Sequence, residues 1–245
     1  MAGPQTGRGI TDNARARVGN HLLADLPHKD LRRLRPHLQI VPLELGQVLY
    51  EPGARIRHCY FLTDGVVSLL SVVSPHKAAE VGMVGREGLV GMSAAVGMNV
   101  SQLRAVVQGS GSAMRISAAN LQKEFASSAS MHRGLFRFHQ ALLGQVAQTA
   151  ACNRFHKAEM RLARWLLVTR DRLRLESFQM THQFLSLMIG VRRVGVTNAA
   201  GSLARRNLIS YSRGKVRILN LSGLQAASCE CYEIVKGMSG KTSGS

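Results

Sequence analysis

Acidic residues are scarce in this chain of 245 residues, which has 14 Asp and Glu against 32 Lys and Arg and a formal net charge of +18. No pair of carboxylates stands in a setting typical of acid–base catalysis. The motifs of phosphate-binding loops, zinc proteases and serine hydrolases are also missing. The sequence therefore predicts a binding protein and not an enzyme. So basic a chain is expected to bind nucleic acid or, more weakly, an anionic membrane surface.

Long apolar runs are missing too. No apolar stretch approaches the ~18–20 residues of a membrane span, and the first twenty residues lack the apolar segment of a secretory signal. We therefore expect a cytoplasmic protein with no membrane partner. The four cysteines are too few and too scattered for a disulfide framework.

Two cysteine arrangements raise the question of a metal. Cys229 and Cys231 are one residue closer than a CxxC hairpin requires and no second pair follows, so free thiols in a tail are the better interpretation. Cys152 and His156 lie four residues apart on one face of a predicted helix, where they could bind a metal or sense oxidants. From the sequence we expect no metal and no other cofactor, and a redox role stays open.

The distribution of glycines divides the N-terminal half of the chain into a tail and a domain. Residues 1–20 are polar and Gly-rich, which predicts a flexible basic tail. A short helix follows, and from about residue 39 to 117 short β-branched runs alternate with glycines. This pattern predicts a small antiparallel barrel or sandwich, so that residues 21–130 form one domain of an α+β protein.

A long helix is predicted over residues 131–157. Apolar or small side chains recur along it about every 3.5 positions, at Leu135, Phe138, Leu142, Val146 and Thr149. Because the helix is too long for an ordinary surface helix, this seam indicates a two-helix dimer contact. Packing of the same face onto the barrel is the alternative.

Residues 177–217 carry seven Lys or Arg and no Asp or Glu. Thr181 is a plausible N-cap for a first short helix, and Gly190 permits a tight turn before a second helix over about 192–206. Residues 213–215 would form the tip of a hairpin. We expect these two helices and the hairpin to belong to a second domain over residues 158–227, and residues 228–245 to form a C-terminal tail.

This order of parts resembles the Crp/Fnr family of bacterial regulators over about residues 22–224. The matching segments are residues 45–53, 60–67, 181–190, 191–203 and 207–209. The resemblance implies a cyclic-nucleotide-binding-like β-roll (a double-stranded β-helix, or jelly roll), a long dimerisation helix and a C-terminal winged helix-turn-helix.

The resemblance also implies roles for exposed side chains. Arg193 matches the base-reading arginine of the family and could bind a guanine edge with both of its terminal nitrogens. Asn198 could read a base or hold a phosphate. The expected phosphate contacts are Thr181, Arg192, Thr197, Arg213 and Lys215. Because Val194 replaces the usual glutamate, we expect a palindromic site with one retained guanine per half-site and a changed flanking preference.

The segment that would hold a cyclic phosphate is degenerate. Gly91 is retained, but Met92 stands in place of the glutamate, Gln102 in place of the arginine and Leu103 in place of the serine. A buried phosphate without a cation is unfavourable. Arg86 and Arg104 are candidate substitutes, the latter only if it faces the same side as Gln102. We therefore expect a pocket that does not bind cyclic AMP, with an unknown effector.

The leading hypothesis is a homodimeric, sequence-specific transcription regulator bound to palindromic double-stranded DNA, with RNA polymerase as a candidate further partner. One alternative is a regulator that does respond to a cyclic nucleotide. The other is a non-specific binder of nucleic acid or other anions, in which only the charge matters.

Overall fold

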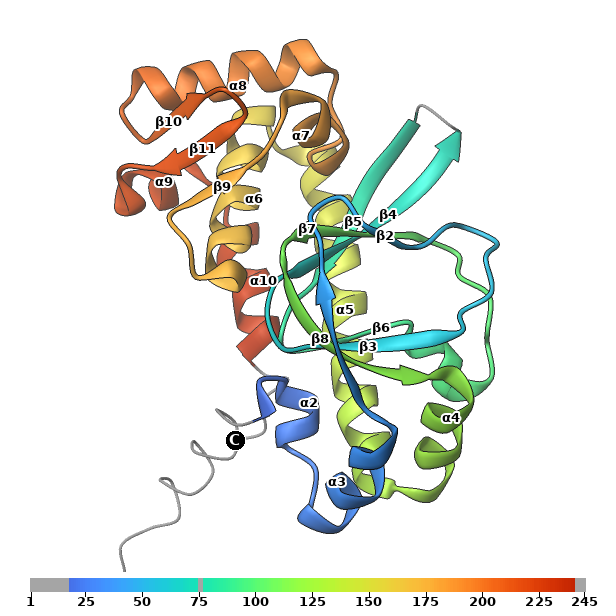
Figure 1. Cartoon of the computed structure of the whole chain (residues 1–245). Coiled ribbons are helices and arrows are strands. Elements are labelled where there is room, and N and C mark those ends of the chain that lie inside the picture. The colour runs from blue at the N-terminus through green and yellow to red at the C-terminus, as the bar shows by residue number, and fades with distance from the viewer. Residues whose placement is uncertain (1–17, 75–76, 241–245) are drawn as a thin grey trace, which may run out of the picture.

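The computed structural model describes residues 18–74 and 77–240 (Figure 1). Most of the expected basic tail lies outside the described residues. Asn20 is fully buried, caps helix α2 (His21–Ala24), and its amide nitrogen lies 2.9–3.0 Å from the carbonyl oxygens of Leu62, Arg86 and Gly88. The first domain therefore begins at or before Asn20.

Two antiparallel four-stranded sheets form this domain, with the strand orders β1-β8-β3-β6 and β2-β7-β4-β5. The strands are β1 (Gln39–Leu43), β2 (Val48–Tyr50), β3 (His58–Leu62), β4 (Val66–Ser74), β5 (Lys77–Val84), β6 (Leu89–Val90), β7 (Arg104–Gly109) and β8 (Gly111–Ser117). The short helices are α3 (His28–Leu34), η1 (Arg35–His37), η2 (Met92–Val96) and α4 (Ala118–Ser127). Gly65 turns the chain from β3 to β4 at φ +83°, where a Cβ would lie 2.6 Å from a carbonyl oxygen. The predicted β-roll is confirmed.

Helix α5 (Ala129–Phe155) runs 27 residues along the β-roll, and the side chain of Ser128 caps its first turn. Leu135 and Phe138 are buried in the core of the roll. Leu142 and Val146 lie against Gly82 of β5, since a Cβ there would be 3.2 and 3.7 Å from their methyl groups. These residues, together with buried Thr149, face their own chain. Leu135, Phe138 and Thr149 are covered by packing within the chain, which is the alternative to a dimer contact, whereas Leu142 and Val146 are half-buried.

The C-terminal domain is a winged helix-turn-helix with a three-stranded sheet of order β10-β11-β9. Its elements are α6 (Ala158–Leu173), β9 (Ser177–Gln179), α7 (His182–Met188), α8 (Arg193–Arg205), β10 (Ile209–Ser212), β11 (Lys215–Ile218) and α9 (Leu221–Ala227). The predicted α+β fold is thereby confirmed as a whole.

The chain continues in helix α10 (Cys231–Gly240), where the sequence analysis expected only a tail. Tyr232 and Val235 are buried, and Met238 lies against Gly144, so α10 packs on α5 and α6. Apolar residues three positions apart direct one face of this short helix inward. Within the described residues, no helix combines the length and the apolarity that crossing a membrane requires.

The two domains share a core. Val66, Leu70 and Met83 of the second sheet belong to the same buried cluster as Trp165 and Leu166 of α6. Burial of apolar side chains stabilises by about 25 cal/mol per Å², so this shared surface holds the C-terminal domain against the β-roll.

Candidate nucleic-acid interface and effector pocket

The helix-turn-helix is formed by α7 and α8, as the sequence predicts. The Oγ1 atom of Thr181 accepts a hydrogen bond of 3.1 Å from the amide of Phe184, which caps α7. Gly190 has φ +59° in the turn, and a Cβ there would lie 3.2 Å from a guanidinium nitrogen of Arg161. The inner face of α8 is buried at Val196, Ala199, Ala200 and Leu203.

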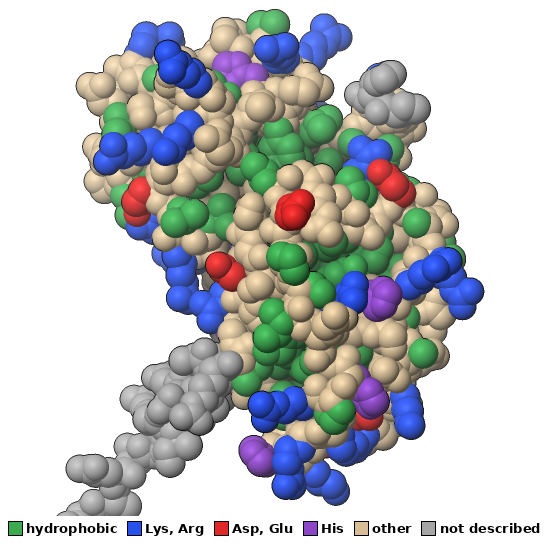
Figure 2. Space-filling view, viewed as in Figure 1, with side chains coloured by type: hydrophobic (Ala, Val, Ile, Leu, Met, Phe, Trp, Pro, Cys, Tyr) green, Lys and Arg blue, Asp and Glu red, His purple; other side chains and the backbone are tan. Residues whose placement is uncertain are grey.

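The outer face of α8 presents the predicted DNA contacts to solvent. Arg193 is the first residue of the helix and Arg192 its N-cap, and both are exposed. Val194 beside them is 71% exposed, and Thr197 and Asn198 are exposed one turn further on. Figure 2 shows Lys and Arg side chains along the upper edge of the molecule, where α8 lies. The N-terminal end of α8 therefore combines cationic side chains with the positive end of a helix dipole.

A network behind this end holds α8 in place, and the sequence analysis missed it. The Oγ1 atom of Thr197 lies 3.1 Å from both the Arg193 carbonyl oxygen and Nδ1 of His182. The His182 ring stacks on Tyr211 at a centroid distance of 4.5 Å, and Tyr211 donates a 2.7 Å hydrogen bond to the Met180 carbonyl. Thr197 therefore has internal partners for its one hydroxyl proton, which weakens its prediction as a phosphate donor.

His182 is held neutral. Burial, and then the positive charge of Arg193, lower the pKa of its imidazole below the usual value of 6.5. A neutral ring avoids a third positive charge behind Arg192 and Arg193 and can accept the proton of Thr197. A histidine and a tyrosine inside a basic window were the only sequence signal for this network.

The wing is the hairpin of β10 and β11, in which Ser212 pairs with Lys215. Arg213 and Gly214 have φ values of 49° and 75°, the pattern of a type I′ turn. Both predicted wing cations, Arg213 and Lys215, are exposed. The Gly214 carbonyl accepts a 2.6 Å hydrogen bond from the amide of Met180, which fixes the wing to the start of the helix-turn-helix.

A cavity of about 580 Å³ lies in the β-roll, at the place where the sequence predicts a degenerate effector pocket. Gly91, Met92, Gln102 and Leu103 all line it. Arg104 does not; its Nε donates to Glu51 at 2.9 Å, outside the cavity. Within the described parts of the chain, no Asp, Glu, Lys or Arg lines this cavity, and His139 is the one basic side chain in the lining.

Helix α5 closes one side of the cavity and carries an exposed apolar stripe. Phe136, which lines the cavity, is 60% exposed, and Leu143 is 53% exposed. Ala147 and Ala150 are exposed too, and Phe136, Leu143 and Ala150 are spaced seven residues apart. Each residue of this stripe directly follows one of the residues that face their own chain.

Comparison with protein families matches both domains. A model described as a cyclic nucleotide-binding domain matches residues 40–128, and one described as a Crp-like helix-turn-helix domain matches residues 160–227. No curated protein sequence gives a significant match.

Solved structures share the fold over nearly their whole lengths. A protein of Eubacterium rectale ascribed to the Crp/Fnr regulators has a TM-score of 0.68 at 14% identity, over 85% of this chain and 98% of that one. FixK2 of Bradyrhizobium japonicum has a TM-score of 0.66 at 14% identity, over 78% and 98%. The c-di-GMP responsive global regulator CLP of Xanthomonas campestris has a TM-score of 0.65 at 16% identity, over 78% and 99%.

Proposed function

The chain belongs to the Crp/Fnr family of transcriptional regulators, and on this premise we propose that it binds a palindromic DNA operator as a homodimer without a cyclic nucleotide. The observation that carries the proposal is the exposed N-terminal end of α8, with Arg193 directed outward from a buried helix. A protein with this role acts on the chromosome, so the proposal also places it in the cytoplasm.

Arg193 and Asn198 are proposed to read bases. The first turn of α8 has no acidic residue that would engage Arg193, and among the described residues no ion pair involves this side chain. Arginine donates two parallel hydrogen bonds to O6 and N7 of guanine in the major groove, and such a contact discriminates by about 1–3 kcal/mol.

The remaining exposed groups are proposed to position the protein on the phosphate backbone. Arg192 lies at the α8 N-terminus, and Arg213 and Lys215 lie on the wing, a few residues from the Met180 contact that fixes the wing. Thr181 and Thr197 are exposed, but their hydroxyl groups have capping or network roles. We therefore assign the binding free energy of the phosphate contacts mainly to these three cations, because each cation releases a condensed counterion from the DNA.

The proposed dimer contact is the exposed stripe of α5 at Phe136, Leu143, Ala147 and Ala150. It replaces the seam expected from sequence. Two α5 helices side by side would bury the stripe of each protomer. This arrangement would place the two copies of α8 in successive major grooves, about 34 Å apart.

The cavity supports an effector other than a cyclic nucleotide, or none. Its lining offers a phosphate no Lys or Arg, and Arg104 and Arg86, the two candidate substitutes, bind Glu51 and the Gly19 carbonyl instead. The family model that matches residues 40–128 describes the fold of this domain, and the lining decides its ligand. A ligand that fits would be largely apolar and uncharged.

Selection from random duplexes followed by competition tests the proposal. The selected consensus is expected to be palindromic, and the protein should prefer it to random duplex by ~10³-fold or more at physiological salt. Equal affinity for both would support a general anion binder instead, and a non-palindromic consensus would contradict the dimeric arrangement.

A further inference from the structure

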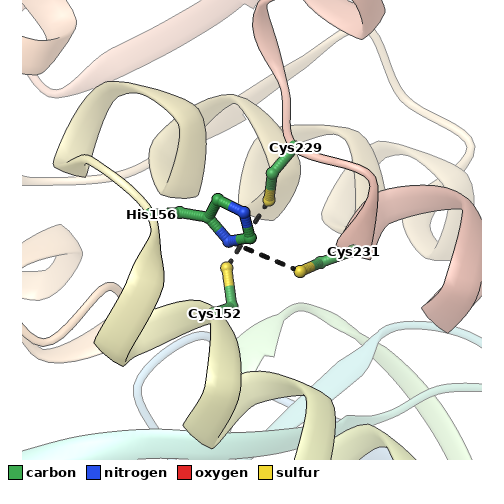
Figure 3. Close-up of side chains that lie close together, drawn as sticks. All are labelled: Cys152, His156, Cys229 and Cys231. Atoms are coloured by element: carbon green, nitrogen blue, oxygen red, sulfur yellow. Dashed lines mark hydrogen bonds between the residues drawn. The ribbon is translucent and has the colours of Figure 1, made fainter.

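Three cysteines and one histidine from distant parts of the sequence meet at the junction of α5, α6 and α10 (Figure 3). Cys152 lies in the last turn of α5, and His156 is the residue that ends this helix. Cys229 and Cys231 stand at the start of α10. The three thiols are at most 3% exposed, and the four potential ligand atoms all lie within 4.8 Å of one another. The sequence analysis considered these residues as two unrelated arrangements.

The distances suit a tetrahedral ion. The Sγ atoms of Cys152 and Cys229 are 3.5 Å apart, and Sγ of Cys231 is 3.6 Å from Nδ1 of His156. Tetrahedral zinc with bonds of about 2.3 Å to sulfur and 2.0 Å to nitrogen separates its ligand atoms by about 3.5–3.8 Å. We propose that Cys152, His156, Cys229 and Cys231 bind one zinc ion, and that this ion fastens α10 to the junction between α5 and the DNA-binding domain.

Neighbouring groups orient the ligands as a metal requires. Oε1 of Glu230 lies 3.1 Å from Nε2 of His156 and accepts its proton, so that Nδ1 keeps a free lone pair directed at the sulfur atoms. Nε2 of Gln148 donates to Sγ of Cys231 at 3.0 Å. A carboxylate behind a histidine and a donor to a thiolate are both typical of the surroundings of a zinc site.

Buried arginines balance the charge. Three thiolates, a neutral imidazole and Zn²⁺ together carry one negative charge, and zinc would displace three thiol protons to form this site. Arg161 and Arg164 are 7% and 4% exposed. The positive charge of Arg164 lowers the pKa of Cys152, and thiolates at Cys152 and Cys229 would favour the charged form of Arg161. An anionic metal centre would offset the cost of burying these two positive charges.

Zinc is favoured over other occupants by the ligand set. Three sulfurs and one nitrogen form a closed site without a position for water, which is the composition of structural zinc sites. The spacing of Cys229 and Cys231 is shorter than in a CxxC hairpin, but the two side chains approach the centre from a turn and a helix start (Figure 3).

The site is connected to the DNA-reading elements. Arg161 donates to the carbonyl oxygen of Ile189, next to Gly190 in the turn between α7 and α8. Tyr232 of α10 donates a 2.8 Å hydrogen bond to Asp171 of α6. The ion therefore stabilises the end of the long helix, the support of the helix-turn-helix and α10 as one unit.

Metal analysis of the purified full chain tests this proposal independently of DNA binding. Prepared under reducing conditions without a chelator or a metal-affinity step, the protein is expected to contain about one zinc per chain. Cys59→Ala is the matched control, because Cys59 is buried in the β-roll away from the cluster, and it should keep the zinc. Cys152→Ser and Cys231→Ser should lose it.

Cobalt substitution keeps the test valid if a serine variant does not fold. Added to the reduced, metal-free native chain, Co²⁺ should give the intense visible bands of a tetrahedral ion and a sulfur-to-cobalt charge-transfer band. His156→Cys should still bind one ion, with a stronger charge-transfer band. Glu230→Gln should weaken binding by about tenfold or more, because the histidine loses its orienting partner.

Three outcomes would overturn the assignment. These are a native chain with neither zinc nor a tetrahedral cobalt spectrum, a Cys59→Ala variant that loses the metal as Cys152→Ser does, and a His156→Cys spectrum identical to that of the native chain. A Cys152–Cys229 disulfide in protein prepared under reducing conditions, found by mass spectrometry, would assign the cluster to redox chemistry instead.

Discussion

The indole Nε1 of Trp165 donates a 3.0 Å hydrogen bond to Oε1 of Glu80, and this buried contact joins the DNA-binding domain to the β-roll. Oε2 of Glu80 lies 2.6 Å from the hydroxyl of Ser68, which also contacts Oε1 of Gln108. One hydroxyl proton serves only one acceptor. With the amide of Gln108 oriented so that its Nε2 donates to Thr169, all the groups are satisfied when Glu80 is protonated and donates to Ser68, which then donates to Gln108.

The first prediction is that the protein loses stability as the pH rises through about 7. Burial raises the pKa of Glu80 from 4.5 to about 7, against the opposing effects of Ser68, Arg164, Trp165 and Arg172. Between these two values the folded chain binds a proton that the unfolded chain releases, so the stabilisation is fully present below pH 4.5 and lost as the pH rises through about 7. The change amounts to roughly 3 kcal/mol and can be measured by urea unfolding at pH 5 and pH 8.

Glu80→Gln serves as the neutral counterpart in this measurement. Its amide can donate to Ser68 while its carbonyl accepts from Trp165, so the variant should show a much smaller fall between the two pH values. Glu51→Gln, at a half-exposed position, should keep the full fall. The same slope in Glu80→Gln as in the native chain would show that another group is responsible.

The second prediction is that cyclic AMP and cyclic GMP leave the melting temperature unchanged. Among the described residues, no Lys or Arg lines the cavity that would receive them, and desolvating an unpaired phosphate is unfavourable. Thermal unfolding with each nucleotide checks this, with 5′-AMP as a control for weak binding to the basic surface. A rise in the melting temperature with a cyclic nucleotide but not with 5′-AMP would contradict the prediction of a degenerate pocket.

The third prediction concerns the dimer. Leu143→Asp places a charge in the proposed contact of two α5 helices, and a buried unpaired charge is costly, so the variant should be monomeric at concentrations where the native chain is dimeric. Light scattering after size-exclusion chromatography measures this. Leu45→Asp alters a similarly exposed leucine on the β-roll and should remain a dimer. A dimeric Leu143→Asp variant would place the contact elsewhere.

Long-range packing explains what could be predicted from sequence and what could not. The glycine corners, the basic window and the caps are local signals, and they predicted the β-roll and the helix-turn-helix with Thr181 and Gly190 in place. The sequence left two partners open for the apolar face of α5, because a 3.5-residue apolar period describes helix packing on a sheet as well as on another helix. Only the fold shows that Leu135 and Phe138 are covered by the roll while Leu143 is exposed.

The cysteine cluster was missed for the same reason. Cys152 and Cys229 are 77 residues apart in sequence, and no local sequence pattern predicts their contact. Helix α10 brings them together, and it was not predicted because a short, partly apolar helix gives a weak pattern. The network of His182 and Tyr211 likewise depends on the wing folding back against α7.

The fourth prediction separates base reading from phosphate contact. Arg193→Ala should relax the base preference at one position per half-site, with a loss of discrimination of about 1–3 kcal/mol. Lys215→Ala should weaken binding evenly across sequences and reduce the salt slope by about one. Arg57→Ala removes the same charge from an exposed site on the β-roll and should do neither. If the Arg193 and Lys215 variants behave alike, the division of roles is wrong.

The last prediction follows from the exposure of Val194, which stands beside Arg193 at the end of α8 and is 71% exposed. A valine offers only apolar contact in the major groove, which favours the methyl group of thymine, whereas a glutamate accepts from N4 of cytosine. Val194→Glu should therefore move the preference next to the retained guanine contact toward cytosine, by roughly 1–3 kcal/mol. Val194→Ala should weaken the original preference without creating a new one. Selection from random duplexes with each variant measures both effects, and an unchanged consensus for Val194→Glu would mean that residue 194 does not face the bases.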